Sequence, residues 1–297
     1  MSTEIQDDAT TPATSQELLP LSGCSFSWLH QAPLIDALRG LAENGLSTFE
    51  LTTAPPHLFS PTFSPYERHE LKRNMAAMGV QPISLNPSFV DLNLISTNPH
   101  IREVSEQQMR AEIELAHDLG ASFVVLIPGR RHGLAPAPAE AVHWVLDDAL
   151  ERLVGRAVEL GITIALENSP YGFLGSGAEL LEIADRIDSP NLGITYDVAN
   201  ALALEDPSEG LRRVARRLRL AHISDTWHDH WAHTSVGRGD VNFAAFAATL
   251  REIGFTGPTV YELVDNESPD GRLAADIANL AAAGWSAEVA PTLEVTR

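Results

Sequence analysis

Lysine and cysteine are nearly missing from this sequence of 297 residues: each occurs once, as Lys72 and Cys24. A single cysteine excludes an internal disulfide and fits a reducing compartment such as the cytoplasm. Schiff-base chemistry needs a desolvated lysine at the reacting site, whereas Lys72 stands in a polar stretch with a helical pattern. A lysine-dependent aldolase is therefore disfavoured.

Long apolar runs and an excess of positive charge are also absent. No segment approaches the roughly 20 apolar residues of a transmembrane helix, and residues 1–17 are polar and acidic, without the apolar core of a secretion signal. We expect residues 1–17 to form a flexible tail ahead of one domain, residues 18–297. The formal net charge of −20 argues against nucleic acid or an anionic membrane as the partner. A cytoplasmic protein with a small-molecule partner is the resulting expectation.

Strand-like and helix-like patterns alternate along the rest of the chain, with glycine or asparagine at the breaks. Runs rich in apolar and β-branched residues predict strands at 21–27, 47–51, 80–85, 122–127, 162–166, 192–197, 220–224 and 259–263. Helical patterns follow at 33–43, 65–78, 100–119, 139–160, 177–187, 208–218, 243–253 and 272–283. This alternation predicts an α/β fold, a single (β/α)8 TIM barrel with a short C-terminal extension. A doubly wound sheet would also alternate, but the first strand-to-helix turn lacks the glycine-rich phosphate fingerprint.

Acidic residues and a histidine stand at the ends of the last four predicted strands. Glu167 ends ITIALE, Asp197 ends GITYD, His222 lies in LAHISD, and Glu262 follows TVY. Taken singly, they have structural alternatives: an ion-pair partner, a helix N-cap, a core histidine and an edge carboxylate. Because the carboxyl ends of barrel strands meet on one face, the four together predict a divalent-metal site. Carboxylates and one imidazole favour Mn²⁺, with Co²⁺, Mg²⁺ or Zn²⁺ as alternatives.

Five stretches carry a family resemblance. ALENSP, GITYDVANAL, AHISDT, SVGRGDVNF and TVYELVD, in this order, resemble the xylose isomerase-like TIM barrels, which include sugar and sugar-phosphate isomerases and epimerases and have endonuclease IV as a relative. The resemblance runs from about residue 21 to residue 284. It implies metal binding by the same four residues. It also implies that Glu167 and Glu262 flank a substrate carbon, where one removes a proton and the other returns it.

The chain departs from the family pattern in its substrate positions. Asn200 stands where many relatives carry a histidine three residues after the aspartate ligand, and an asparagine carries no proton at neutral pH. His228 stands where the epimerases have an arginine. Ile127, Asn200 and Trp231 replace residues that the three-zinc cluster of endonuclease IV needs, so DNA repair is disfavoured.

A sugar, keto-sugar or sugar-phosphate isomerase or epimerase is the first expectation for function. The runner-up is a lyase on the same scaffold: a dehydroshikimate- or keto-inositol-type dehydratase, or an enzyme that cleaves a 3-keto-glycoside. A non-catalytic sugar-binding subunit would be expected to have lost a ligand, and none is lost. The expected partner is a small carbohydrate or polyol. Such barrels also form homo-oligomers, although the sequence carries no oligomerisation signature.

Five further residues are candidates for substrate binding: Asn200, His233, Arg130, Glu50 and Trp28. Arg130, after the fourth strand, would bind an anionic or polyhydroxyl group, or pair with the acidic surface. His233 directly precedes TSVGRGD, in which the glycines serve backbone geometry. Glu50 would accept substrate hydroxyls or pair with an arginine. Trp28 would form a sugar-stacking wall or pack at the rim.

Overall fold

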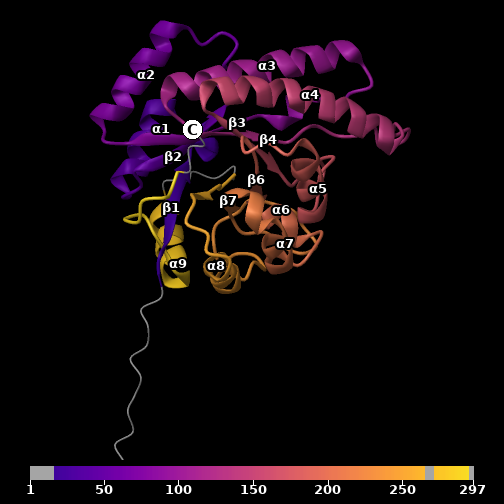
Figure 1. Cartoon of the computed structure of the whole chain (residues 1–297). Coiled ribbons are helices and arrows are strands. Elements are labelled where there is room, and N and C mark those ends of the chain that lie inside the picture. The colour runs from indigo at the N-terminus through magenta and orange to yellow at the C-terminus, as the bar shows by residue number, and fades with distance from the viewer. Residues whose placement is uncertain (1–16, 265–270, 294–297) are drawn as a thin grey trace, which may run out of the picture.

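One closed barrel of parallel strands forms the centre of this computed structural model, which describes residues 17–264 and 271–293 (Figure 1). The predicted tail, residues 1–17, lies outside the described residues except for Glu17. The strands pair in the order β2-β3-β4-β5-β6-β7-β8-β1, and the pairing of β1 with β2 closes the barrel. Their bounds are Leu19–Cys24, Thr48–Thr53, Gln81–Pro87, Phe123–Leu126, Thr163–Glu167, Leu192–Asp197, Leu218–Ile223 and Thr259–Tyr261 for β1 to β8, with a short β9, Trp285–Ser286, beside β1.

Helices surround the barrel and confirm the predicted (β/α)8 architecture; α3 and α4 lie side by side across the top of Figure 1, and α8 and α9 lie at the bottom. The bounds of α1 to α9 are Leu34–Glu43, Pro65–Ala77, Pro99–Leu119, Ala139–Leu160, Gly177–Ile187, Val198–Leu202, Pro207–Val214, Phe243–Glu252 and Leu273–Ala283. Three short 3-10 turns add η1, Phe26–Trp28, η2, Phe89–Asp91, and η3, Ala215–Arg217. Among the described helices, no apolar segment is long enough to cross a bilayer.

Local signals set the helix ends. Ser64 and Ser176 each begin a helix with a capping box, in which the serine side chain accepts from the backbone N–H of a glutamate three residues later. Gly120 and Gly161 end the long helices α3 and α4 with φ of +87° and +68°, a region that glycine enters without steric cost. These signals lie in the sequence, which is why most helix bounds were predicted to within one or two residues.

Three details of the secondary structure were predicted wrongly or missed. The predicted strand 21–27 ends at Cys24, because the 3-10 turn η1 follows at Phe26–Trp28. The predicted helix 208–218 stops at Val214, because a 3-10 turn follows and β7 already begins at Leu218. The short helix α6 was not predicted. It forms directly after β6 because the side chain of Asp197 caps it, accepting from the N–H of Asn200 at 2.6 Å.

An apolar plug fills the barrel below the predicted metal ligands. Side chains alternate along a strand, so a residue two positions before another lies on the same face. Ala165, Leu220 and Val260 stand two residues before Glu167, His222 and Glu262, and all three are fully buried. They belong to one buried cluster with Cys24, Ile83, Phe123 and Val125. The four predicted ligands therefore lie above a packed layer of apolar side chains.

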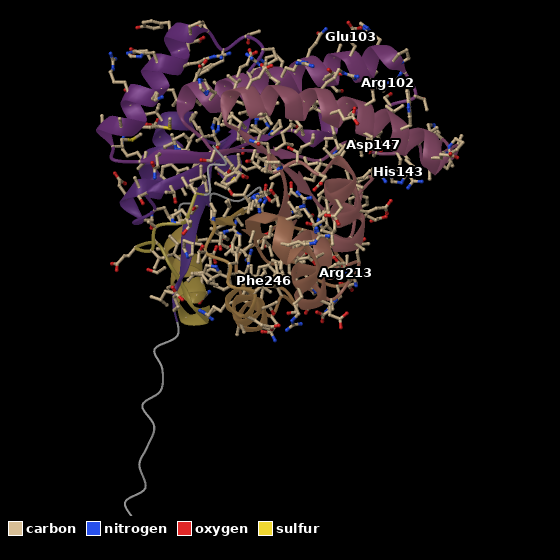
Figure 2. All side chains as sticks on the ribbon, viewed as in Figure 1. Arg102, Glu103, His143, Asp147, Arg213 and Phe246 are labelled. Atoms are coloured by element: carbon tan, nitrogen blue, oxygen red, sulfur yellow. The ribbon has the colours of Figure 1, made fainter. Side chains whose placement is uncertain are left out.

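Ion pairs join neighbouring helices on the outer layer. Arg186 of α5 pairs with Asp147 of α4 at 2.7 Å and contacts the Nδ1 atom of His143 at 2.9 Å; Figure 2 labels these two α4 side chains. Such exposed pairs contribute little stability each. The larger hydrophobic cluster between strands and helices holds the layers together.

Candidate metal centre

The structure brings the four predicted ligands together at the carboxyl ends of β5, β6, β7 and β8. Ligand atoms of Glu167, Asp197, His222 and Glu262 all lie within 4.8 Å of one another, and all four residues are buried. Glu167 and Asp197 are the last residues of their strands, His222 stands one residue before the end of β7, and Glu262 directly follows β8. The barrel closure thus aligns four strand ends on one cluster.

His222 stands at the centre of this cluster. Its Nδ1 atom lies 3.1 Å from Oε1 of Glu167 and 3.3 Å from Oε2 of Glu262. Its Nε2 atom faces the other way and lies 3.1 Å from Oε2 of Glu50. Both ring nitrogens of one buried imidazole are therefore engaged by carboxylates.

Asp197 carries a buried oxygen that lacks a hydrogen-bond partner in the described part of the chain. Its Oδ1 atom accepts from the N–H of Asn200, while Oδ2 is buried and unpartnered. The backbone of Asp197 is clamped by Asn168, whose side chain accepts from its N–H at 2.8 Å and donates to its C=O at 2.9 Å. A buried, unsatisfied carboxylate oxygen is costly. A cation at this position would satisfy it.

The electrostatics of the cluster also fit a cation. Burial raises the pKa of Glu167 to about 7 and raises the pKa of Asp197 well above its ordinary value, and the nearby carboxylates add to both shifts. Burial alone would lower the pKa of His222, but the carboxylates of Glu50, Glu262 and Glu167 raise it instead. Burial opposes ionisation of Glu262 too, yet the His222 charge lowers its pKa. Four carboxylates around one imidazole favour a divalent ion.

The solvent side of the site is marked by small differences in side-chain exposure. Glu50 and His222 are 0% exposed, Glu167 4%, Glu262 6% and His233 10%. His233 is therefore the most exposed of these five side chains. The Nδ1 atom of that histidine lies 3.7 Å from Oε2 of Glu262, which places His233 beside the predicted ligands.

Trp231 and Tyr171 border His233. The ring of Trp231 meets the rings of His233 and Tyr171 edge to face, with centroids 5.4 and 5.1 Å apart. The indole N–H of Trp231 donates to Oδ1 of Asn200 at 2.7 Å, while the amide of Asn200 donates to the C=O of Asn168 at 2.9 Å. Both ends of the Asn200 side chain are thus engaged, and Asn200 links the aromatic border to the Asp197 segment.

The other predicted substrate residues lie apart from the four ligands or beneath them. Trp28 is 4% exposed and belongs to the main hydrophobic cluster, as the packing alternative expected. Arg130 is exposed and lines a pocket of about 230 Å³ with residues of the segments 93–97 and 130–132. Glu50 is fully buried under the site. Of the candidates for substrate contact, His233 has a side chain that lies beside the ligands, 3.7 Å from Glu262, and is 10% exposed.

Sequence reasoning missed several polar residues that support the site: Asn86, Asn168 and Ser84. Asn86 donates through Nδ2 to Glu50 at 2.9 Å and to Glu262 at 3.0 Å, and Ser84 donates to Glu50 at 2.7 Å. The available signal was position: Asn168 follows Glu167 directly, and Ser84 and Asn86 alternate along β3, on the face that turns inward.

The side chain of Asp225 accepts hydrogen bonds from the backbone of the VGRGD turn, whose glycines were expected to serve backbone geometry. The Oδ2 atom of Asp225 accepts from the N–H groups of Gly237 and Gly239, at 2.8 and 2.9 Å. A Cβ atom on Gly239 would lie 2.1 Å from the carbonyl oxygen of Thr226. The turn is closed on itself by these bonds and holds the loop that carries His233.

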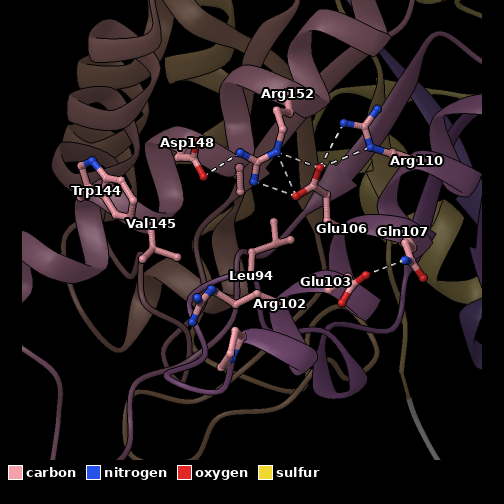
Figure 3. Close-up of a pocket in the computed structure, with 12 residues that line it drawn as sticks. Leu94, Arg102, Glu103, Glu106, Gln107, Arg110, Trp144, Val145, Asp148 and Arg152 are labelled. Atoms are coloured by element: carbon pink, nitrogen blue, oxygen red, sulfur yellow. Dashed lines mark hydrogen bonds and ion pairs between the residues drawn. The ribbon is translucent and has the colours of Figure 1, made fainter.

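A separate groove of about 410 Å³ runs between α3 and α4 on the outside of the barrel (Figure 3). Glu106 at its wall accepts from Arg152 at 2.8 Å and from Arg110 at 3.0 Å, and Arg152 also pairs with Asp148 at 2.6 Å. The charges of the groove are therefore largely paired with each other.

Comparisons with known proteins agree with the barrel fold. Residues 38–283 match the family described as xylose isomerase-like TIM barrel. An uncharacterized protein of Methanocaldococcus jannaschii is 30% identical over 239 residues, which cover 75% of this chain and 77% of that protein. The L-ribulose 3-epimerase of a Methylomonas species is 26% identical, over 61% of this chain and 63% of that protein, just under two thirds of its length. A solved D-tagatose 3-epimerase-like protein superposes with a TM-score of 0.77 at 26% identity, over 88% of this chain and 96% of that one.

Proposed function

Because the chain belongs to the xylose isomerase-like TIM barrel family, we propose that it is a divalent-metal-dependent isomerase or epimerase that acts on a sugar, a keto-sugar or a sugar phosphate. The observation that carries this proposal is the buried cluster of Glu167, Asp197, His222 and Glu262, in which Asp197 Oδ2 has no hydrogen-bond partner within the described ranges. These four residues would hold the ion, Mn²⁺ first, with Co²⁺, Mg²⁺ or Zn²⁺ as alternatives.

The proposed reaction moves a proton on the carbon next to a carbonyl group. When bound, the ion supplies positive charge that stabilises the negative charge developing on the substrate oxygens. Glu167 and Glu262 act as general base and general acid: one removes the proton and the other returns it. Support for this pair comes from their origin on β5 and β8, and from side chains that are 4% and 6% exposed, whereas Glu50 and His222 are 0% exposed.

Substrate contacts in this proposal centre on His233 and Trp231. The Nδ1 atom of His233 lies 2.9 Å from the hydroxyl of Ser224, which orients the ring beside Glu262. Aromatic side chains stack on the apolar face of a sugar, and the border formed by Trp231 and Tyr171 offers such a surface. Asn200 is assigned the role of holding Trp231 in place. Arg130 is retained as the candidate contact for an anionic substituent, and Trp28 as packing.

A proton-exchange assay tests the function directly. The protein is stripped with a chelator, reloaded with each of the four metals and incubated with a panel of ketoses and ketose phosphates in D₂O. We expect deuterium to enter one substrate carbon as its configuration or its carbonyl position changes. Glu167→Gln and Glu262→Gln should abolish exchange, whereas Glu252→Gln, on the exposed face of α8, serves as the matched control.

The same assay separates the alternatives. Loss of water or of an aglycone, with the same dependence on metal and on both glutamates, would make the protein the runner-up lyase. If every metal-loaded form binds sugar but exchanges no proton, the protein would be a non-catalytic sugar-binding subunit. A wild-type protein that takes up none of the four metals would overturn the proposal.

A further inference from the structure

Glu50 lies beneath the four proposed ligands and contacts one of them, His222. Its Oε2 atom lies 3.1 Å from the Nε2 atom of His222, on the side of the ring opposite to Glu167 and Glu262. We propose that Glu50 is a positioning residue that fixes the orientation and tautomer of His222, so that the Nδ1 atom faces the ion. This inference rests on the metal site of the proposed function and adds a residue to it.

This contact matters because it determines which nitrogen of His222 carries the proton and which can bind a metal. A neutral histidine carries one N–H, and the nitrogen that donates it cannot bind a metal. Because Glu50 accepts at Nε2, the proton is assigned there and the Nδ1 lone pair points toward Glu167 and Glu262. A carboxylate that accepts from a ligating histidine also makes the histidine a stronger ligand.

Glu50 is itself held by donors that leave it little freedom. Ser84 donates to its Oε2 atom at 2.7 Å, and the Nδ2 atom of Asn86 donates to Oε1 at 2.9 Å. The same Nδ2 atom reaches Oε1 of Glu262 at 3.0 Å, so one amide ties the supporting carboxylate to a ligand. A buried carboxylate persists when its oxygens are hydrogen-bonded in this way.

A second ion is the competing explanation for these contacts. Potential ligand atoms of Cys24, Glu50 and Glu262 also lie within 4.8 Å of one another. However, Ser84, Asn86 and His222 already use both oxygens of Glu50, and the Cys24 thiol lies 3.9 Å from it. The geometry therefore favours support over ligation.

Direct substrate contact by Glu50 is disfavoured for a different reason. Its side chain is 0% exposed, and the equally buried His222 contacts it from the ligand cluster. A sugar that entered from the side of His233 would meet Glu262 and Glu167 first. Glu50 thus acts through another residue.

The test measures metal affinity, which does not require turnover. Wild type, Glu50→Ala, Glu50→Gln and Ser84→Ala are titrated with Co²⁺ in competition with a chelator, and the visible absorption of bound Co²⁺ reports ligand geometry. We expect Glu50→Ala to bind roughly 10- to 100-fold more weakly with an altered spectrum. Glu50→Gln keeps an acceptor for the Nε2 proton, so it should recover much of the affinity and the wild-type spectrum. Ser84→Ala should lose less than Glu50→Ala.

Two controls make the outcome decisive. Cys24→Ser, beside Glu50, should bind one ion per chain as wild type does, and far-UV circular dichroism should confirm that each variant is folded. If Glu50→Ala does not fold, Ser84→Ala carries the comparison, with a smaller expected loss of affinity. Affinity and spectrum unchanged in folded Glu50→Ala, or in Ser84→Ala where Glu50→Ala does not fold, would overturn the inference while the proposed function stands. Two ions in wild type, with one lost in Cys24→Ser, would also overturn it, because Glu50 would then be a ligand. If replacing Glu50 weakens metal binding but the wild-type protein exchanges no proton of any ketose, the inference would be supported and the proposed function overturned.

Discussion

Replacing Glu112 by glutamine should stabilise the protein at alkaline pH and have little effect in acid. Glu112 lies on α3 and is fully buried; the hydroxyl of Ser60 donates to its Oε1 atom at 2.6 Å. Its Oε2 atom has no hydrogen-bond partner within the part of the chain that the structure describes. Burial raises the pKa of this carboxyl from an ordinary 4.5 to about 7.

The raised pKa fixes the sign and the size of the effect. Below about pH 4 the carboxyl is protonated in both the folded and the unfolded chain and contributes no difference. As the pH rises from about 4.5 toward 7, the unfolded chain releases the proton while the folded chain keeps it, so the free energy of unfolding falls. Because one pKa unit corresponds to about 1.4 kcal/mol, the loss between about pH 5 and pH 8 is about 2 to 3 kcal/mol. Glutamine mimics the neutral acid and removes this loss.

Urea denaturation at about pH 5 and pH 8 measures the prediction. The difference in unfolding free energy between Glu112→Gln and wild type should be about 2 to 3 kcal/mol more favourable at the higher pH. Glu103→Gln, on the same helix and with a 65% exposed side chain, controls for the loss of a charge. A Glu112→Gln variant whose stability follows the wild-type pH profile would show that Glu112 is ionised in the folded protein, and the reasoning would be wrong.

Three further predictions concern the site and its surroundings. Asp197→Asn keeps the helix cap but loses the charge, so Co²⁺ affinity should fall at least about tenfold, while circular dichroism remains that of wild type. Gly239→Ala places a methyl group 2.1 Å from the Thr226 carbonyl oxygen and should cost about 1–3 kcal/mol of stability in thermal unfolding. Its matched control, Gly155→Ala in α4, meets open space and should instead stabilise by about 0.5–1 kcal/mol. Glu106→Gln should lower the unfolding free energy by less than about 1 kcal/mol, and by less still in high salt, as urea titrations at two ionic strengths would show.

The barrel was predictable because its elements follow local rules. Alternating apolar strands and glycine-stopped helices predicted the eight β/α units, and the bounds of α4, α5 and β6 agree with the structure residue for residue. Prediction failed at the end of β1, where the 3-10 turn η1 replaces the last predicted strand residues, and also at α6 and at the end of α7. There a single side chain, Asp197, begins a five-residue helix, and a 3-10 turn replaces the last helical residues. Elements this short carry no periodic pattern to recognise.

The convergence of the four proposed ligands was predictable for a related reason, but the residues that support them were not. Parallel barrel strands place their carboxyl ends on one face, so four polar strand ends had to converge. Which nitrogen of His222 faces which carboxylate depends on side-chain rotamers and on β2 and β3, far away in sequence. Asn86 and Glu262 are separated by 176 positions, yet they share a hydrogen bond. No local pattern encodes such a pair.

The two halves of the barrel therefore contribute differently to one site. Strands β5 to β8 supply the atoms that would meet the ion, whereas β2 and β3 supply Glu50, Ser84 and Asn86, which hold those atoms from beneath. Because a side chain in the supporting set contacts the ion only through a ligand, its replacement changes how tightly and in what geometry the ion is held. Replacement of Glu167 or Glu262 would also remove one of the two proposed proton carriers. Variants of the supporting residues should therefore bind the metal more weakly but keep proton exchange. Variants of Glu167 or Glu262 should lose proton exchange.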